Sequence, residues 1–492
     1  MLRSLTIPST GRFFIFVICA ALGVSAYAGV AAANGHAGFP LDDAWIHQTY
    51  ARTLAQTGQL AFAPGQLSAG STAPLWTLLI SAAYRFGFDA YTWTLALGAL
   101  CLALTGWLIY RLSDRLSPNR SGVAWAAGLF AVFEWHLIWA AASGMETMLF
   151  SALSLALIDR VWGRERGWLI GVLGGLLILT RPEGLLLVAP AALLTLTRSD
   201  RGGFKEFAAT LTAALVTIAP GAWFNFQASG ALFPNTFYAK QAEYAVLLSA
   251  PDIWLSTVGQ MLAAPLAGSG AVLLPGLGAW IVAQRRSIIR REAWPQWLPL
   301  FWIAAHTGVY GLRLPVHYQH GRYLIPIIPV LIVYGVAGLG TITSGRGINR
   351  AAPIAGRVLS LAAAVVLIVF VPIGAAAYAT DVAVIDDEMV AVAQWLHTHT
   401  PPGAIIAAHD IGALGYFARR PLLDMAGLIS PEVVPFIRDE DRLWSWLRAR
   451  GADYVVTFTD WYPELIQQPE LTAVFAGRSA ASPTHLTVYE VK

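Results

Sequence analysis

Residues 13–45, FFIFVICAALGVSAYAGVAAANGHAGFPLDDAW, join a long apolar run to two adjacent aspartates. About 20 apolar residues are enough to cross a bilayer as a helix, and Phe13–Ala33 reaches that length. Two arginines precede the run and no clear cleavage site follows it, so we predict an uncleaved first membrane helix and not a signal peptide. Asp42 and Asp43 then follow this helix directly on the other side of the membrane.

The composition of the whole chain supports this interpretation. Of its 492 residues, 56% are hydrophobic and 12% are charged. Soluble domains carry about 25% charged residues, so this composition excludes a soluble enzyme and a disordered chain. Apolar runs that contain Pro, Gly and Trp favour helices over a β-barrel. The net charge of only +3 and the two cysteines in apolar stretches, Cys19 and Cys101, indicate neither nucleic-acid binding nor a disulfide framework.

Ten further apolar segments follow the first, which predicts about eleven membrane helices. They lie at residues 91–110, 121–142, 146–159, 167–180, 184–198, 207–228, 268–284, 297–312, 322–342 and 357–378. Five basic groups separate them: Arg111, Arg115 and Arg120; Arg160, Arg164 and Arg166; Arg198, Arg201 and Lys205; Arg285, Arg286, Arg290 and Arg291; Arg346, Arg350 and Arg357. Because basic residues stay on the cytoplasmic side, we place these groups and the N-terminus inside. The short apolar piece Pro74–Phe86 must then lie at the interface.

The last predicted helix leaves residues 380–492 outside. Apolar runs there predict strands at 404–408, 454–458 and 485–491, and helices are predicted at 386–399 and 440–450. The chain is therefore predicted to be a polytopic α-helical membrane protein with two parts. A transmembrane domain spans residues 1–379, its outer loop 35–90 carrying juxtamembrane helices, and an extracytoplasmic α/β domain spans 380–492. The predicted location is the cell membrane, with a cytoplasmic N-terminus.

Polar motifs gather between the helices on the predicted outer side, whereas the inner side carries little except arginine. The motifs are Leu41–Trp45, Ser68–Pro74, Gly144–Thr147, Arg181–Gly184, Phe233–Lys240 and His317–Tyr323. This asymmetry predicts a polar site at the outer membrane interface.

Asp42 and Asp43 are the first candidates for that site. Adjacent carboxylates raise each other's pKa, which suits a general base or a metal ligand. They also stand where the N-terminal cap of a predicted amphipathic helix, Ala44–Thr57, would lie. The sequence leaves both roles open, including a division in which Asp42 caps the helix and Asp43 does chemistry.

Charged residues near the other helix ends complete the candidate set. Glu146 and Glu183 lie just inside apolar runs, where a charge is costly, although a local ion pair of Glu183 with Arg181 is the simpler interpretation. Lys240 could hold a phosphate, with a solvated loop charge as the alternative. Arg322 stands at an outer boundary, where a guanidinium can clamp a lipid phosphate or extend to the interface.

Together these residues resemble the GT-C superfamily of integral-membrane glycosyltransferases, and more narrowly its bacterial branch with the actinobacterial arabinofuranosyltransferases. The similarity covers nearly the whole chain. The motifs that carry it are Asp42-Asp43-Ala44, Pro64-Gly65, Ser71-Thr72-Ala73-Pro74-Leu75-Trp76, Gly144-Met145-Glu146-Thr147, Arg181-Pro182-Glu183-Gly184, Pro234-Asn235-Thr236-Phe237-Tyr238-Ala239-Lys240, Arg322-Tyr323 and Asp410-Ile411-Gly412 near Asp424. The resemblance implies a transferase that moves a sugar, with inversion, from a polyprenyl-phosphate donor to an extracytoplasmic glycan, lipid or protein acceptor.

The resemblance also implies roles for the candidate residues. Asp42 or Asp43 would be the base. The donor phosphate would be bound by Lys240, Arg322, Tyr323 and His320, and the substrates would be contacted by Trp45, Trp76, Glu146, Arg181, Glu183, Asn235 and Tyr238. No cofactor is certain, because family members differ: a divalent cation, Mg²⁺ or Mn²⁺, held by Asp43 and Glu146 is left open. For His409, Asp410 and Asp424 a structural turn is favoured, with an acceptor-facing role as the alternative.

Two other functions remain alternatives. A transporter or flippase of lipid-linked sugars would show matching halves with broken helices, and we find none. A non-catalytic membrane subunit could retain the same fold, because fold does not fix function. Membrane lipids are the remaining predicted partners, and no nucleic acid is expected.

Overall fold

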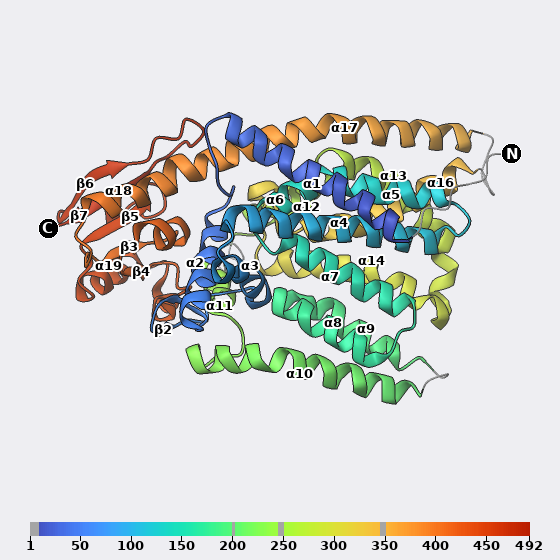
Figure 1. Ribbon diagram of the computed structural model, residues 1–492, viewed down its shortest axis with the longest axis horizontal. Coiled ribbons are helices and arrows are strands. Elements are labelled where there is room, and N and C mark those ends of the chain that lie inside the picture. Colours follow the sequence, from blue (N-terminus) through green and yellow to red (C-terminus); the bar gives the residue numbers. More distant parts are fainter. Residues whose placement is uncertain (1–8, 199–201, 245–249, 345–350) are drawn as a thin grey trace.

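The computed structural model describes residues 9–198, 202–244, 250–344 and 351–492. Long helices form a bundle, and a small domain with a β-sheet lies at one end of it (Figure 1). Helix α1 (Ser9–Ala33) starts at the opposite end and packs against α17 (Ala352–Val384), which leads the chain back to the sheet domain. Arg201, Arg346 and Arg350 of the predicted inner groups lie outside the described residues.

Each predicted apolar segment corresponds to helix in the structure. The bundle consists of α1, α4 (Ala90–Leu116), α5 (Ser121–Phe133), α6 (Trp135–Ala142), α7 (Thr147–Trp162), α8 (Gly167–Thr180), α9 (Leu185–Thr195), α10 (Gly203–Ser229), α13 (Ser269–Gln284), α14 (Trp294–Arg313), α16 (Ile328–Thr343) and α17. In the described part, five helices are long and apolar enough to cross a membrane, or seven if each of two bent pairs is one span. Helices α8 and α9 are shorter, so the predicted count of eleven is not confirmed.

Shorter elements cover the end of the bundle that faces the sheet domain. They are α2 (Asp42–Thr57), β1 (Ala61–Ala63), β2 (Gln66–Leu67), α3 (Pro74–Phe86), α11 (Asn235–Tyr244), α12 (Pro251–Ala263) and α15 (Tyr318–Gly321). The predicted amphipathic helix is α2, which begins two residues earlier, at Asp42. The short apolar piece is α3, with the predicted bounds. Helix α11 was not predicted, because its sequence alternates polar and aromatic residues without an apolar face.

The C-terminal domain contains a five-stranded sheet in the order β4-β3-β5-β7-β6. Its elements are α18 (Ala391–His399), β3 (Ile406–Ala408), β4 (Leu422–Asp424), α19 (Glu440–Ala449), β5 (Tyr454–Phe458), β6 (Leu471–Ala476) and β7 (Leu486–Val491). Strands β4, β3 and β5 are parallel, and β7 and β6 join antiparallel. The three predicted strands are confirmed as β3, β5 and β7, whereas β4 and β6 were missed. Helix runs unbroken from α17 into α18, so the division at residue 379 stays a prediction.

Helix α2 ties the sheet domain to the bundle. Both carboxylate oxygens of Asp42 accept hydrogen bonds from the domain, from the amides of Gly412 and Ala413 at 2.7 Å each. Gly412 lies so close that a Cβ atom there would come within 2.0 Å of the Asp42 carbonyl oxygen. One turn further along α2, the Trp45 ring packs against Tyr416 of the domain. These contacts hold the sheet domain against the first turn of α2.

Candidate functional site

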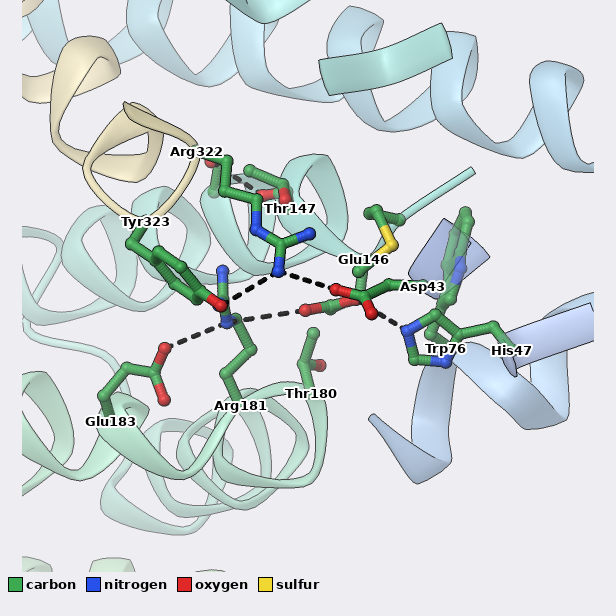
Figure 2. Close-up of polar contacts among 12 residues, drawn as sticks. Asp43, His47, Trp76, Glu146, Thr147, Thr180, Arg181, Glu183, Arg322 and Tyr323 are labelled. Atoms are coloured by element: carbon green, nitrogen blue, oxygen red, sulfur yellow. Dashed lines mark hydrogen bonds and ion pairs between the residues drawn. The ribbon is translucent and has the colours of Figure 1, made fainter. Parts of the chain in front are cut away.

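A cavity of about 600 Å³ lies where the bundle meets the sheet domain. It is lined by α2, by the segments before α7 and after α8, by α11, by the end of α14, by Arg322 and Tyr323, and by the segments that follow β3 and β4. Most of its wall is apolar, and the apolar part includes Leu185, Leu186, Phe233, Val309 and Leu312. Charged side chains gather on the rest of the wall, as Figure 2 shows.

Asp43 lies in the first turn of α2 and faces this cavity, which leaves its side chain 38% exposed. Its Oδ2 atom is 2.6 Å from Nη2 of Arg322. Burial opposes ionisation of Asp43, but the charges of Arg322 and Lys240 outweigh it and hold the pKa of this carboxyl below its ordinary value. Asp43 is therefore an ionised carboxylate across the physiological pH range.

Asp42 behaves differently, although it is the neighbouring residue. Its side chain is buried, and both oxygens are occupied by the amides of the sheet domain. Burial raises the pKa of Asp42 to about 6, against the effect of the two amide hydrogen bonds. The structure thus separates the pair: Asp42 holds two parts of the chain together, and Asp43 presents a carboxylate to the cavity.

Arg322 is the principal partner of Asp43. Its Nη2 also donates to the hydroxyl of Tyr323 at 2.9 Å, and its guanidinium lies over the Tyr323 ring at 4.9 Å. Its Nε is buried and has no hydrogen-bond partner among the described residues. The group therefore keeps donor capacity that the protein itself does not use.

A second cation, Arg181, lies between two glutamates, and its guanidinium is 5.4 Å from the centre of the Tyr323 ring (Figure 2). Its Nε is 2.9 Å from Glu183 and 3.4 Å from Glu146. Glu146 in turn contacts His47 Nε2 at 3.2 Å, and Tyr310 donates a hydrogen bond to Glu183. The expected local ion pair of Arg181 with Glu183 is present, but it belongs to a larger network that lines the cavity.

His47 was not singled out in the sequence. It is buried, lines the cavity and lies one helical turn after Asp43 on α2. Residues four apart share a helix face, so this spacing was a usable signal. Its Nδ1 has no partner among the described residues.

Lys240 reaches the cavity from α11. Its Nζ is 3.0 Å from Glu243 and lies over the Tyr244 ring at 5.9 Å. Burial would lower the pKa of Lys240, but the Glu243 carboxylate outweighs it and raises the pKa, so the side chain is cationic. With Arg313 at the end of α14, which also lines the cavity, Lys240, Arg181 and Arg322 bring four cations to one cavity.

The sheet domain contributes His409 and Asp410, which follow β3. The imidazole is 2.7 Å from the Tyr462 hydroxyl through Nδ1, and burial lowers the pKa of His409 to about 4, so the ring is neutral. Burial and the charges of Asp42 and Asp43 raise the pKa of Asp410 well above its ordinary value. Both residues therefore line the cavity, and the acceptor-facing role that the sequence offered as the alternative stays a prediction.

Five predicted site residues do not line the cavity. Trp45 packs between α2 and the sheet domain, and Trp76 is buried with its Nε1 on the Gly144 carbonyl at 2.9 Å. Asn235 donates to the Leu428 carbonyl at 3.1 Å, whereas Tyr238 points outward. His320 is paired with Asp381 at 2.7 Å. Except for the exposed Tyr238, these side chains support the frame of the cavity. Asp424 accepts hydrogen bonds from the amides of Ala426 and Ile429 and forms the expected structural turn.

Asp43 and Glu146 do not fit a divalent-cation site. Each carboxylate already faces a guanidinium, Arg322 for Asp43 and Arg181 for Glu146. Across the described ranges, no group of three or more His, Cys, Asp or Glu side chains is arranged to hold a metal ion.

Comparisons with known proteins agree on the fold. Over 98% of both chains the structure is similar to ArnT from Cupriavidus metallidurans bound to undecaprenyl phosphate, with a TM-score of 0.56 and 15% identity. It is also similar to the Archaeoglobus fulgidus oligosaccharyltransferase in its apo form, with a TM-score of 0.60 and 11% identity over 98% of this chain and 74% of that one. The same archaeal enzyme, AglB, in complex with an inhibitory peptide and a dolichol-phosphate, gives a TM-score of 0.54 and 12% identity over the same shares.

These neighbours are GT-C glycosyltransferases, and at 11–15% identity the likeness shows the fold alone: the chain shares their fold, and several of its helices are long and apolar enough to cross a membrane. The narrower resemblance to arabinofuranosyltransferases is not confirmed. Residues 383–489 match a family described as a domain of unknown function, DUF8728. No curated protein matches the sequence.

Proposed function

We propose that the chain is an inverting glycosyltransferase that takes its sugar from a polyprenyl-phosphate donor. One observation carries the proposal: a single cavity combines an ionised aspartate, four cations and an apolar wall formed by bundle helices. A lipid-linked sugar phosphate has the matching three parts, an anion, a hydroxyl-rich ring and a long apolar chain. The fold that the chain shares with ArnT and AglB, which bind undecaprenyl phosphate and dolichol-phosphate, supports the same donor class.

In the proposed reaction Asp43 removes the proton of an acceptor hydroxyl while that oxygen attacks the anomeric carbon. The bond between the anomeric carbon and the phosphate oxygen breaks, and its electron pair leaves with the polyprenyl phosphate. Arg322 and Lys240 stabilise the charge that develops on this leaving group, with Arg181 as a further cation in the same cavity. Attack from the face opposite the phosphate inverts the anomeric centre.

We also propose that the bundle, residues 1–379, spans the membrane with its N-terminus in the cytoplasm, and that residues 380–492 lie outside. The start of α1 and the sheet domain lie at opposite ends of the bundle, which supports opposite sides (Figure 1). The cavity between bundle and domain would then lie at the outer surface, where a polyprenyl-phosphate sugar presents its head group.

The experiment uses the full chain in lipid nanodiscs with a panel of radiolabelled polyprenyl-phosphate sugars, each offered with oligosaccharide, lipid and peptide acceptors, and follows the release of polyprenyl phosphate. We expect release by the wild type and a loss of about 100-fold or more for Asp43→Asn, since general base catalysis contributes about 10²–10⁴-fold. Asp252→Asn, a surface carboxylate on α12, is the matched control and should react like the wild type.

The outcomes separate the alternatives. Equal release by the wild type and by Asp43→Asn would reject Asp43 as the general base. In sealed liposomes that carry the chain, transfer of intact donor across the bilayer without release would identify a transporter. Binding of donor without turnover by either protein would identify a non-catalytic subunit.

A further inference from the structure

The sheet domain opens onto the cavity through the carboxyl ends of its parallel strands. His409 and Asp410 follow β3, and Ala426 and Leu428 follow β4; all four line the cavity. In open α/β sheets, ligands bind in the crevice outside the carboxyl ends of two neighbouring strands whose connections leave in opposite directions. Here β3 connects to β4 on one side, whereas β5 connects to β6 and β7 on the other. The crevice therefore lies between the ends of β3 and β5.

The side chains at this crevice have unused binding capacity. Asp410 forms no hydrogen bond or ion pair with the described residues. The neutral His409 ring uses one nitrogen for the Tyr462 hydroxyl and keeps the other. Trp461, three residues after β5, is 41% exposed, and its ring lies 4.8 Å from the His409 ring at 72°. An exposed aromatic surface thus borders a carboxyl and an imidazole at the edge of the cavity.

We propose that this crevice, formed by Asp410, His409 and Trp461, is the acceptor subsite and that the acceptor is a saccharide. The inference rests on the proposed function, because it assigns the second substrate of the same cavity. The apolar face of a sugar ring would stack on Trp461, and its hydroxyls would bond Asp410 and His409. The reacting hydroxyl would then enter the cavity that Asp43 also lines.

The distribution of charge favours a saccharide over the other two acceptor classes. All cations that line the cavity belong to the helical part of the chain: Arg181, Lys240, Arg313 and Arg322. The described residues of the sheet domain contribute no cation to the cavity wall. A phosphate-bearing lipid acceptor would therefore have no ionic partner on this wall. Strand addition, one common mode of peptide recognition, uses the backbone of an edge strand, whereas the crevice offers side-chain groups at strand ends. Hydroxyls and an apolar ring face match what Asp410, His409 and Trp461 present.

This inference also gives residues 383–489 a role. The matched domain contains α18, the whole sheet and the three crevice residues. The Asp42 carboxylate holds this domain by accepting hydrogen bonds from the Gly412 and Ala413 amides. Asp410 therefore lies two residues before a fixed contact. The domain would accordingly present the acceptor to a donor that the bundle binds.

The test measures binding of the fluorescently labelled full chain in nanodiscs to a printed array of bacterial oligosaccharides. A set of synthetic peptides and vesicles of phosphatidylglycerol are the comparison probes. We expect saturable binding to a subset of the oligosaccharides, weakened tenfold or more by Trp461→Ala and by Asp410→Ala and retained by Trp461→Phe. Asp460→Asn is the matched control, because Asp460 is an exposed carboxylate after β5 that does not line the cavity.

Three results would overturn the inference: no oligosaccharide bound, oligosaccharide binding that Trp461→Ala leaves unchanged, or binding only to peptides or vesicles. Binding of undecaprenyl phosphate to the same samples reports on the donor side separately. If the lipid phosphate binds and no saccharide does, the acceptor inference fails and the proposed transferase stands. If neither binds, both fail.

Discussion

Replacing Asp43 by Asn should tighten the binding of polyprenyl phosphate while it abolishes transfer. In the structure Asp43 Oδ2 holds Arg322 Nη2 at 2.6 Å, so an incoming phosphate must compete with this carboxylate for the guanidinium. Asparagine keeps the size of the side chain and removes both the competing charge and its repulsion of the phosphate.

The magnitude follows from the environment of the pair. Two charges about 3 Å apart attract by several kcal/mol at an effective dielectric of about 20, before solvent and desolvation are counted. Asp43 is 38% exposed, and exposed pairs are worth about 1 kcal/mol or less after screening. Because Arg322 is only 11% exposed, we place the net value between these limits, at about 1–2 kcal/mol. The dissociation constant should therefore fall by about 5- to 30-fold.

The assay is equilibrium binding of a fluorescent polyprenyl phosphate to the full chain in nanodiscs. Arg322→Gln should weaken binding, and Asp43→Asn should give a smaller gain in an Arg322→Gln background, because only the relief of repulsion then remains. The pKa of Asp43 lies below its ordinary value, so the ratio between wild type and variant should persist from pH 8 to pH 5. Unchanged or weaker binding by Asp43→Asn would refute the competition for Arg322. So would an equal gain in the two backgrounds.

Three further predictions concern the frame of the site. Asp42→Asn should speed hydrogen exchange in residues 409–418, because the asparagine amide accepts hydrogen bonds through one oxygen only. The Gly412 or the Ala413 amide then loses its partner, which weakens the contact between α2 and the sheet domain by about 1–3 kcal/mol. Unchanged exchange in these residues would contradict the docking role of Asp42. Asp159→Ala should lower the midpoint of thermal unfolding, with an expected cost of about 1–3 kcal/mol. The buried Asp159 carboxylate of α7 forms ion pairs at 2.8–3.1 Å with Arg111 and Arg115 of α4 and with Arg160 of its own helix. Asp114→Ala, on the exposed side of α4, is the control and should unfold like the wild type. The pKa of His409 is lowered to about 4 in the folded chain and is about 6.5 when unfolded, so the unfolded state takes up the proton first and stability falls as the pH drops from 6.5 to 4. The free energy of unfolding should change with pH by at most about 1.4 kcal/mol per pH unit through this residue. The midpoints of thermal unfolding at pH 7 and pH 5 should therefore differ less for His409→Gln than for the wild type. An equal difference would show that His409 is not held neutral.

Several elements could be predicted from local sequence. Each apolar segment from residues 13–33 to 357–378 coincides with helix, and Pro74–Phe86 has the predicted bounds, because hydropathy and proline or glycine positions act over a few turns of chain. Strands β3, β5 and β7 were likewise found from short apolar runs. Strands β4 and β6 were missed, because β4 offers only two apolar residues, Leu422 and Leu423, and the middle of β6 is exposed, which leaves too little pattern.

The candidate site was likewise predicted only in part from the sequence. The sequence placed the two aspartates beside each other after the first helix and collected the outer polar motifs, but it could not choose between Asp42 and Asp43. That choice depends on partners far along the chain: the Gly412 and Ala413 amides occupy Asp42, whereas Arg322 meets Asp43. The same holds for Trp45 and Trp76, whose aromatic character suggested substrate contact but whose neighbours bury them in the frame.

The sequence by itself determined that the chain is a helical membrane protein with charged motifs between its spans, because the free energy of placing each segment in a bilayer depends on that segment alone. Only the tertiary structure decided which of those charges share a cavity and which compensate one another. Ionisation, hydrogen bonding and exposure of a side chain depend on atoms within a few ångströms, and in this fold those atoms come from α2, the segments around α7 to α9, α11, Arg322 and the ends of β3 and β4.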